Sequence, residues 1–148
     1  ASLATAEAAI AAAAATIEAQ ATEQAVTARR VDAALNPRYV EEQITVDAAG
    51  IPAGNDDAVD DARTALRRTL LRYASDDDCR VGVALTFGHA ATIGEGTVLA
   101  AAINDLAVNA APDLFAGAAF DAFGDLNPPP GQVDLRLYFF SGCAAAED

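Results

Sequence analysis

The chain has 148 residues and a net charge of −13, and much of its 53% hydrophobic content is alanine within the first 35 positions. This charge would repel nucleic acid and anionic membrane surfaces, so we expect neither as a partner. No run of 18 strongly apolar residues is present, so we expect no membrane-spanning segment. The length allows one domain with its own core, plus an appendage.

Residues 3–35 are expected to form one long helix, because alanine has the highest helix propensity and Pro37 cannot continue a helix. Large apolar residues recur at a spacing of seven, at Leu3, Ile10 and Ile17. The partner positions of each heptad are mostly alanine, so the pattern does not establish a coiled coil. We interpret residues 1–37 as a helical stalk or linker. Self-association into a homo-oligomer through residues 3–35 is the alternative.

After this segment, strand patterns alternate with helix patterns. Strands are expected over residues 39–47, 79–89, 117–123 and 132–141, and helices from Asn55 to Tyr73 and over residues 97–111. The resulting order, β-α-β-α-β-β, predicts a two-layer α/β (α+β) sandwich with helices on one sheet face or both. Right-handed crossovers make the first two strands parallel. We place this domain at residues 38–143 and expect a disordered tail at residues 144–148.

The segment from Cys79 to His89 organises the domain. Larger side chains and small ones alternate along it, with Val81, Val83, Leu85 and Phe87 on one face and Gly82, Ala84 and Thr86 on the other. Small residues on a strand face allow a helix to lie close. We therefore expect this strand to be central in the sheet, with a helix against its small-residue face.

The two expected helices each carry an apolar stripe at spacings of three and four. In the first helix, Asn55 is the expected N-cap, and aspartates early and arginines late complement the helix dipole. Its stripe is Val59, Ala62, Leu66, Leu70 and Tyr73. The stripe of the second helix is Leu99, Ala102, Ile103, Leu106 and Ala110.

No motif of nucleophilic, zinc-protease, phosphate-loop or dinucleotide chemistry is present. His89 is the single histidine and the only candidate general base, but a lone histidine at a strand end is usually a hydrogen-bonded structural residue. We therefore expect no enzyme, no cofactor and no metal site. Gly94-Glu95-Gly96 is expected to open a helix rather than cradle an anion, because Glu95 would oppose a phosphate. Cys79 and Cys143 form either a disulfide or two free buried thiols.

Residues 40–141 resemble the OmpA-like C-terminal domain, a βαβαββ sandwich that binds peptidoglycan in the bacterial periplasm. Three segments carry the resemblance: Gly88-His89 resembles the start of the family's Gly-His-Thr-Asp motif, Phe123-Gly-Asp-Leu-Asn-Pro128 its Gly-x-Gly-Glu-x-x-Pro loop, and Val133-Asp-Leu-Arg-Leu-Tyr-Phe139 its closing strand. The resemblance implies a mixed four-stranded sheet in which the last strand runs antiparallel beside the second. It thereby implies a Cys79–Cys143 disulfide and a periplasmic or secreted location.

The resemblance also implies where a ligand would bind. In the family, an aspartate of the Gly-His-Thr-Asp loop and an arginine of the following helix clasp the charged ends of diaminopimelate. Here the loop reads Gly88-His-Ala-Ala-Thr92, and no arginine follows in the helix. Losing both halves of a charged clasp should abolish that specific recognition. The remaining candidate ligand-binding residues are His89, Thr92, Glu95, Asn104 and Asp105.

The sequence is thus compatible with three functions. The first is a non-catalytic cell-envelope binding module whose partner is peptidoglycan or an envelope protein. The second is an assembly module that oligomerises through its N-terminal helix. The third, ranked last, is a small hydrolase that uses His89.

Overall fold

The computed structural model describes residues 35–147. Apart from Leu35, the helix expected over residues 3–35 lies outside the described residues, and so does its proposed self-association seam. The described part contains, in order, β1 (Val40–Thr45), α2 (Asp56–Ala74), β2 (Val81–His89), α3 (Ile93–Ala110), β3 (Ala119–Asp125), β4 (Gln132–Phe139) and α4 (Ala144–Glu147). The expected βαβαββ order is confirmed, and the fold is α+β.

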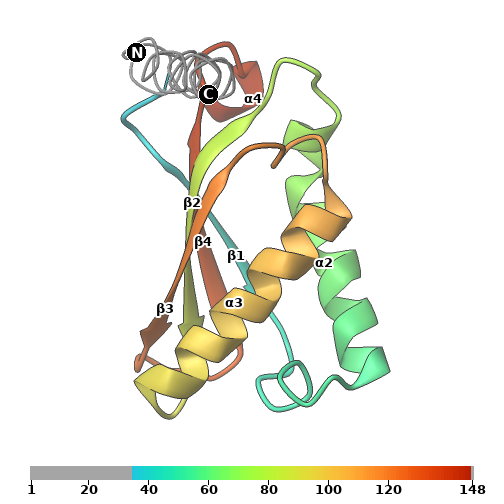
Figure 1. Ribbon diagram of the computed structural model, residues 1–148, viewed down its shortest axis with the longest axis vertical. Coiled ribbons are helices and arrows are strands. Elements are labelled where there is room, and N and C mark those ends of the chain that lie inside the picture. Colours follow the sequence, from blue (N-terminus) through green and yellow to red (C-terminus); the bar gives the residue numbers. More distant parts are fainter. Residues whose placement is uncertain (1–34, 148) are drawn as a thin grey trace, which may run out of the picture. The chain divides into compact units, whose positions relative to one another are not determined.

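The four strands form one mixed sheet in the order β1-β4-β2-β3. Strand β4 is antiparallel to both of its neighbours, and β2 is parallel to β3. Strands β1 and β2 therefore run in the same direction on either side of β4, as expected for right-handed crossovers. The central position predicted for β2 is also confirmed. Helices α2 and α3 both lie on one face of this sheet (Figure 1).

Helix α2 begins where the sequence predicts. The side chain of Asn55 caps it by accepting a hydrogen bond from the backbone N–H of Ala58. The residues buried beneath it are Ala58, Ala62, Leu66, Leu70 and Tyr73. The expected stripe is thus right except at its start, where Ala58 replaces the half-buried Val59.

Helix α3 begins four residues earlier than predicted. Thr92 is its N-cap and accepts a hydrogen bond from the N–H of Glu95, so the glycines at positions 94 and 96 fall inside the helix. Its buried positions are Gly96, Leu99, Ala100, Ile103, Asn104 and Ala107. Ala102, Leu106 and Ala110, which were expected in the stripe, are only partly buried. The buried stripe is therefore rotated from the predicted one.

Helix α3 packs against the small-residue face of β2, as predicted. Ala84 and Thr86 are fully buried there, whereas Leu85 and Phe87 point to the opposite face. Val81 and Val83 do not share a face, because a bulge between them shifts the register against β4. Val81 pairs with the buried Phe139 and Val83 with the neighbouring Tyr138. The predicted common face for Val81 and Val83 is therefore wrong.

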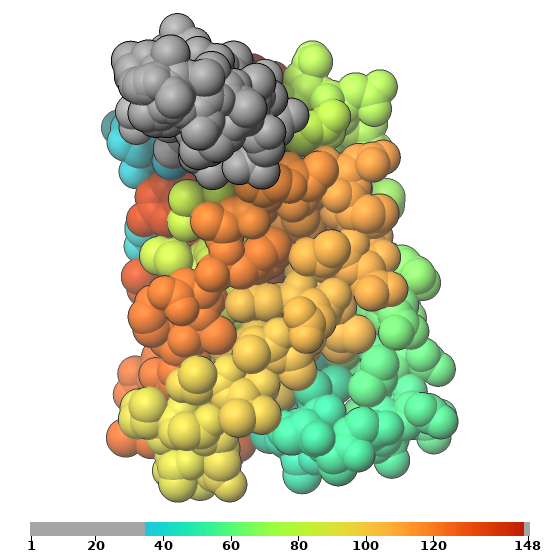
Figure 2. All heavy atoms as spheres, in the orientation of Figure 1, coloured from blue at the N-terminus to red at the C-terminus, as the bar shows by residue number. Residues whose placement is uncertain are grey.

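The core lies between the sheet and the two helices. Strand β4 alternates strictly, with its odd-numbered residues buried against the helices and its even-numbered ones on the other face. The largest fully buried side chains are Tyr73, Phe139, Leu66, Leu70, Leu99, Ile103, Leu135 and Leu137. Side chains of α2 and α3 meet along the outer layer (Figure 2).

No helix among residues 35–147 covers the second face of the sheet. Arg136 lies on this face, with its guanidinium 4.6 Å from the ring centre of Phe87 and 5.1 Å from that of Tyr39. The Phe87 ring is in turn stacked on Phe123. This face therefore combines aromatic and charged side chains. His89, Asp125 and Asp134 form a charged cluster at its rim.

None of the helices within residues 35–147 has the length and hydropathy needed to cross a bilayer. The segment expected as a disordered tail, residues 144–148, contains the short helix α4.

Candidate functional site

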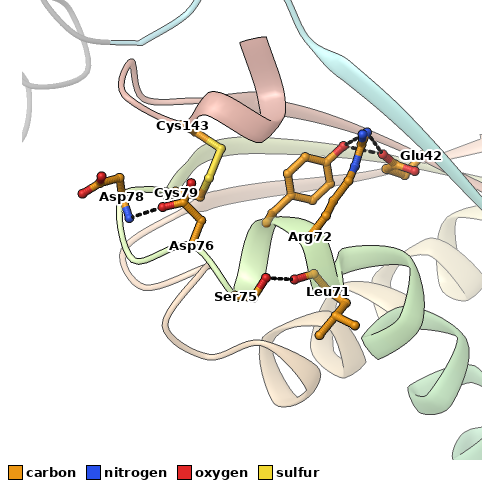
Figure 3. The surroundings of a disulfide bond; sticks show 9 residues. Glu42, Leu71, Arg72, Ser75, Asp76, Asp78, Cys79 and Cys143 are labelled. Atoms are coloured by element: carbon orange, nitrogen blue, oxygen red, sulfur yellow. Dashed lines mark hydrogen bonds and ion pairs between the residues drawn. A yellow bond between two sulfur atoms is a disulfide. The ribbon is translucent and has the colours of Figure 1, made fainter. Parts of the chain in front are cut away.

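Cys79 and Cys143 form a disulfide, with their Cα atoms 4.4 Å apart. Cys79 precedes β2 and Cys143 follows β4, so the antiparallel pairing of these strands brings the two residues together. Both residues are buried. Figure 3 shows the bond beside the C-terminal end of α2, where Ser75 donates to the carbonyl oxygen of Leu71. The pairing implied by the family resemblance is confirmed.

A cluster of hydrogen-bonded polar side chains connects α2 to β1 near the disulfide. The hydroxyl of the buried Tyr73 donates to Glu42, and the Arg72 guanidinium donates to both the Tyr73 hydroxyl and Glu42 (Figure 3). Burial and the hydrogen bond to Glu42 raise the pKa of Tyr73 to about 12. Each of these polar groups finds its partner within the cluster. We interpret the cluster as a structural connection between helix and sheet.

His89 is buried at the end of β2, with both ring nitrogens engaged. Nδ1 lies 2.6 Å from the carbonyl oxygen of Asn127, and Nε2 lies 2.7 Å from Oδ2 of Asp134. Oδ2 of Asp125 is 3.7 Å from the same Nε2 atom. Within residues 35–147, no serine, threonine or cysteine hydroxyl or thiol is hydrogen-bonded to this histidine.

The surroundings of His89 favour its charged form. Burial lowers its pKa, but the hydrogen bonds to the Asn127 carbonyl and the Asp134 carboxylate outweigh burial and raise the pKa above 6.5. Burial similarly acts to raise the pKa of Asp134, whereas hydrogen bonds from His89, Gln43 and Gln132 lower it below 3.8 overall. When the imidazole is protonated, the two residues form an ion pair between β2 and β4.

Thr92 and Glu95, two of the predicted site residues, lie together at the start of α3. The Thr92 hydroxyl accepts from the N–H of Glu95 and contacts its carboxylate at 3.2 Å. Both side chains are exposed, on the helix side of the sheet. His89 faces the opposite side, because Gly88, the preceding residue on the strand, contacts α3.

The structure also separates the other two predicted residues. Asn104 is buried beneath α3, where it accepts from the Thr86 hydroxyl at 2.5 Å and donates to the carbonyl oxygen of Asp121. Asp105, its neighbour in sequence, is exposed on the outer side of the helix. Of the five candidate residues, the structure thus brings only Thr92 and Glu95 into contact.

A cavity of about 360 Å³ lies beside these two residues. Three loops at one end of the sheet line it, and the lining residues are Ala48, Ala49, Pro52, Ala90, Ala91, Glu95 and Pro130. Glu95 supplies the only ionisable side chain of this lining. Helix α3, which begins at the cavity, carries no lysine or arginine. The cavity can therefore contact an aliphatic group and place a carboxylate beside a cationic one, but its lining holds no cationic side chain for an anion.

Comparisons of the chain with models of protein families, with curated proteins and with solved structures found no match.

The partners of His89 were not predicted from the sequence; they are Asp125, Asn127 and Asp134. Two signals point to them. Asp134 belongs to the polar set that alternates along β4, and β4 is antiparallel to β2 with Phe87 opposite Asp134. Asp125 is the partner of His89 in the parallel pairing of β2 with β3. Both signals require the strand register, which local patterns do not define.

Proposed function

We propose that this domain is a non-catalytic binding module of the cell envelope, organised like the OmpA-like domain and acting in the periplasm or outside the cell. The observation that carries the proposal is the position of the cavity. Ala90 and Ala91, which directly follow Gly88-His89, form part of its lining. In the OmpA-like family, the equivalent loop holds the ligand.

The disulfide supports the proposed location, because such bonds persist mainly in oxidising compartments. The engagement of both ring nitrogens of His89 supports a non-catalytic role, since neither nitrogen is directed at a hydroxyl or thiol nucleophile among the described residues. The engagement of His89 favours a binding module over the hydrolase alternative.

The composition of the cavity favours a ligand that differs from the family's. Alanines replace the loop residues that would include the clasping aspartate, and α3 offers no guanidinium for a carboxylate. Glu95 remains to accept a cationic group. We propose that the cavity binds an amine-bearing peptide of the peptidoglycan through Glu95 and aliphatic contacts, more weakly than a full charged clasp would.

Co-sedimentation of the full chain with insoluble peptidoglycan tests this function. The wild-type chain should be retained in the pellet, and Ala91→Trp, which fills the cavity from an exposed position, should abolish retention. Glu95→Gln should weaken retention, because it removes the charge that accepts the amine. Ala101→Trp is the matched control, since Ala101 is exposed on α3 outside the cavity lining, and this variant should be retained like the wild type.

Absence of the wild-type chain from the pellet would rule out peptidoglycan as the ligand. Retention that Ala91→Trp leaves unchanged would place binding elsewhere on the chain. The assembly alternative has its own measurement, which is the mass of the full chain by light scattering. A monomeric mass across the concentration range would exclude it.

A further inference from the structure

Three atoms that can bind a metal ion converge at the rim of the uncovered sheet face. They come from His89, Asp125 and Asp134, and one ligand atom of each residue lies within 4.8 Å of the others. Oδ2 of Asp134 and Oδ2 of Asp125 lie 2.7 and 3.7 Å from Nε2 of His89. The histidine ends β2, Asp125 ends β3, and Asp134 stands near the start of β4. Three neighbouring strands therefore position these three atoms.

Hydrogen bonds orient each of these side chains through its other polar atom. Nδ1 of His89 must carry its hydrogen, because the Asn127 carbonyl oxygen 2.6 Å away can only accept. Nε2 is therefore the ring nitrogen that can bind an ion, which would replace the proton that Nε2 shares with Asp134 in the charged form. The backbone N–H of Asn127 also donates to Oδ1 of Asp125 at 2.8 Å, so one loop residue orients two of the three side chains.

Asp134 is held in the same way. Its Oδ1 atom accepts from the side-chain amide of Gln43 at 2.8 Å and from that of Gln132 at 3.1 Å, which leaves Oδ2 directed at the cluster. Metal-binding histidines and carboxylates in proteins usually have such outer hydrogen bonds, which fix the orientation of the ligand atoms. An ion pair between His89 and Asp134 would not by itself require hydrogen bonds to the other polar atom of each side chain.

The charges of the cluster also favour a cation. Two carboxylates stand beside one imidazole, so the group carries a charge of −2 when the ring is neutral. A divalent ion would bring this charge to zero. The side chain of Asp125 is 28% exposed, so solvent reaches the cluster from that side.

We propose that His89, Asp125 and Asp134 bind one divalent transition-metal ion, of which Zn²⁺ is representative, and leave a remaining coordination position to water. One imidazole and two carboxylates are a donor set that suits this class of ion. Ligands at about 2.0–2.1 Å from a tetrahedral ion lie about 3.4 Å apart. The separations from Nε2 to the two carboxylate oxygens, 2.7 and 3.7 Å, require only small adjustments to reach this geometry.

This site is distinct from the proposed peptidoglycan-binding cavity, because the cavity lining contains none of these three residues. The proposal differs from the sequence expectation of no metal site. That expectation rested on the single histidine and the lack of a known motif, whereas two of these three ligands are carboxylates brought to the histidine by strand pairing.

Calorimetric titration of the chelator-treated full chain with ZnCl₂ at neutral pH tests the proposal. We expect one ion per chain and a raised melting temperature in its presence. His89→Gln, Asp125→Asn and Asp134→Asn should each weaken binding by at least about tenfold. Asp121→Asn is the matched control, because Asp121 is an exposed carboxylate on β3, and this variant should bind like the wild type.

The Asp125→Asn variant separates the loss of an ion ligand from misfolding. Asp125 is partly exposed and lies 3.7 Å from Nε2, beyond hydrogen-bond distance, so this change should leave the fold intact. The chain has a single histidine, so its imidazole nitrogen resonances report on this site without ambiguity. Zn²⁺ should shift the Nε2 resonance. Absence of Zn²⁺ binding, unchanged affinity in the Asp125→Asn and His89→Gln variants, an unmoved Nε2 resonance, or equal affinity for Mg²⁺ would each overturn the proposal.

Discussion

Gly88 on β2 and Gly96 on α3 are in direct backbone contact. A Cβ atom added to Gly88 would lie 2.2 Å from the carbonyl oxygen of Gly96, and one added to Gly96 would lie 2.2 Å from that of Gly88. A Cβ on Gly124 of β3 would likewise lie 2.1 Å from the carbonyl oxygen of Ile93. The first turns of α3 therefore rest on two strands with no side chain between them.

Gly88→Ala and Gly96→Ala should each destabilise the domain, because the new methyl group meets backbone that cannot rotate away. Overpacking of this kind costs typically about 1–3 kcal/mol and occasionally more. Gly94→Ala is the matched control on the same helix, since a Cβ there meets nothing within 4 Å. It should stabilise the domain by about 0.5–1 kcal/mol through helix propensity. Urea denaturation measures all three, and equal stabilities for Gly88→Ala and Gly94→Ala would contradict the contact.

Removing the disulfide should lower the free energy of unfolding. Cys79 and Cys143 are 64 residues apart, and a loop of this length contributes about 4 kcal/mol in the chain-entropy account. The double variant Cys79→Ala/Cys143→Ala should show this loss in urea denaturation. Thiol labelling of the unreduced chain in denaturant should find no free thiol within residues 35–147. Two labelled thiols per chain would refute the bond.

Tyr73 should ionise later than an ordinary tyrosine, with a pKa of about 12 against a usual value of 10. A raised pKa means that the folded state holds the phenolic proton more tightly than the unfolded state. The resulting stabilisation is complete below pH 10 and is lost as the pH rises toward 12. Absorbance titrations of the wild type and of Tyr73→Phe differ by the tyrosinate signal of Tyr73. This difference should develop at a higher pH than the signal of the other tyrosines. If the difference develops near pH 10 in the folded chain, the shift is absent.

The buried pair of Thr86 and Asn104 should be coupled. Thr86→Val leaves the Asn104 side-chain oxygen without its hydroxyl donor, at a cost of about 1–3 kcal/mol. Asn104→Leu removes the acceptor, and adding it to Thr86→Val should cost less than the sum of the single changes. Asp105→Ala, at the adjacent exposed position, should stay within about 0.5 kcal/mol of the wild type. Strict additivity of the two buried changes would contradict the coupling.

Local signals predicted most of the secondary structure. The cap at Asn55 and the stripe from Ala62 to Tyr73 were readable because each depends on residues within a few turns. The start of α3 was misplaced because glycines disfavour helix interiors, and the reason for Gly96, its contact with Gly88, is a tertiary one.

The charged cluster could not be predicted for a related reason. His89, Asp125 and Asp134 are separated by 36 and 9 residues along the chain, and only the pairing of β2 with β3 and β4 places them together. The bulge before Val83 further decides which face of β2 each residue occupies. Composition and alternation describe the faces of a strand, but they do not describe its partners.

The position of the disulfide affects how the domain would respond to mechanical tension. Residues 79–143 form a covalently closed loop that contains β2, α3, β3 and β4, so stretching the chain cannot extend them while the bond is intact. A force applied beyond Cys143 passes through the disulfide to Cys79 and on toward α2, so it does not peel β4 from the sheet. The extensible part of the described chain is then limited to the residues before Cys79 and after Cys143, and a single-molecule pulling trace should lengthen by the contour of this loop once a reductant is added.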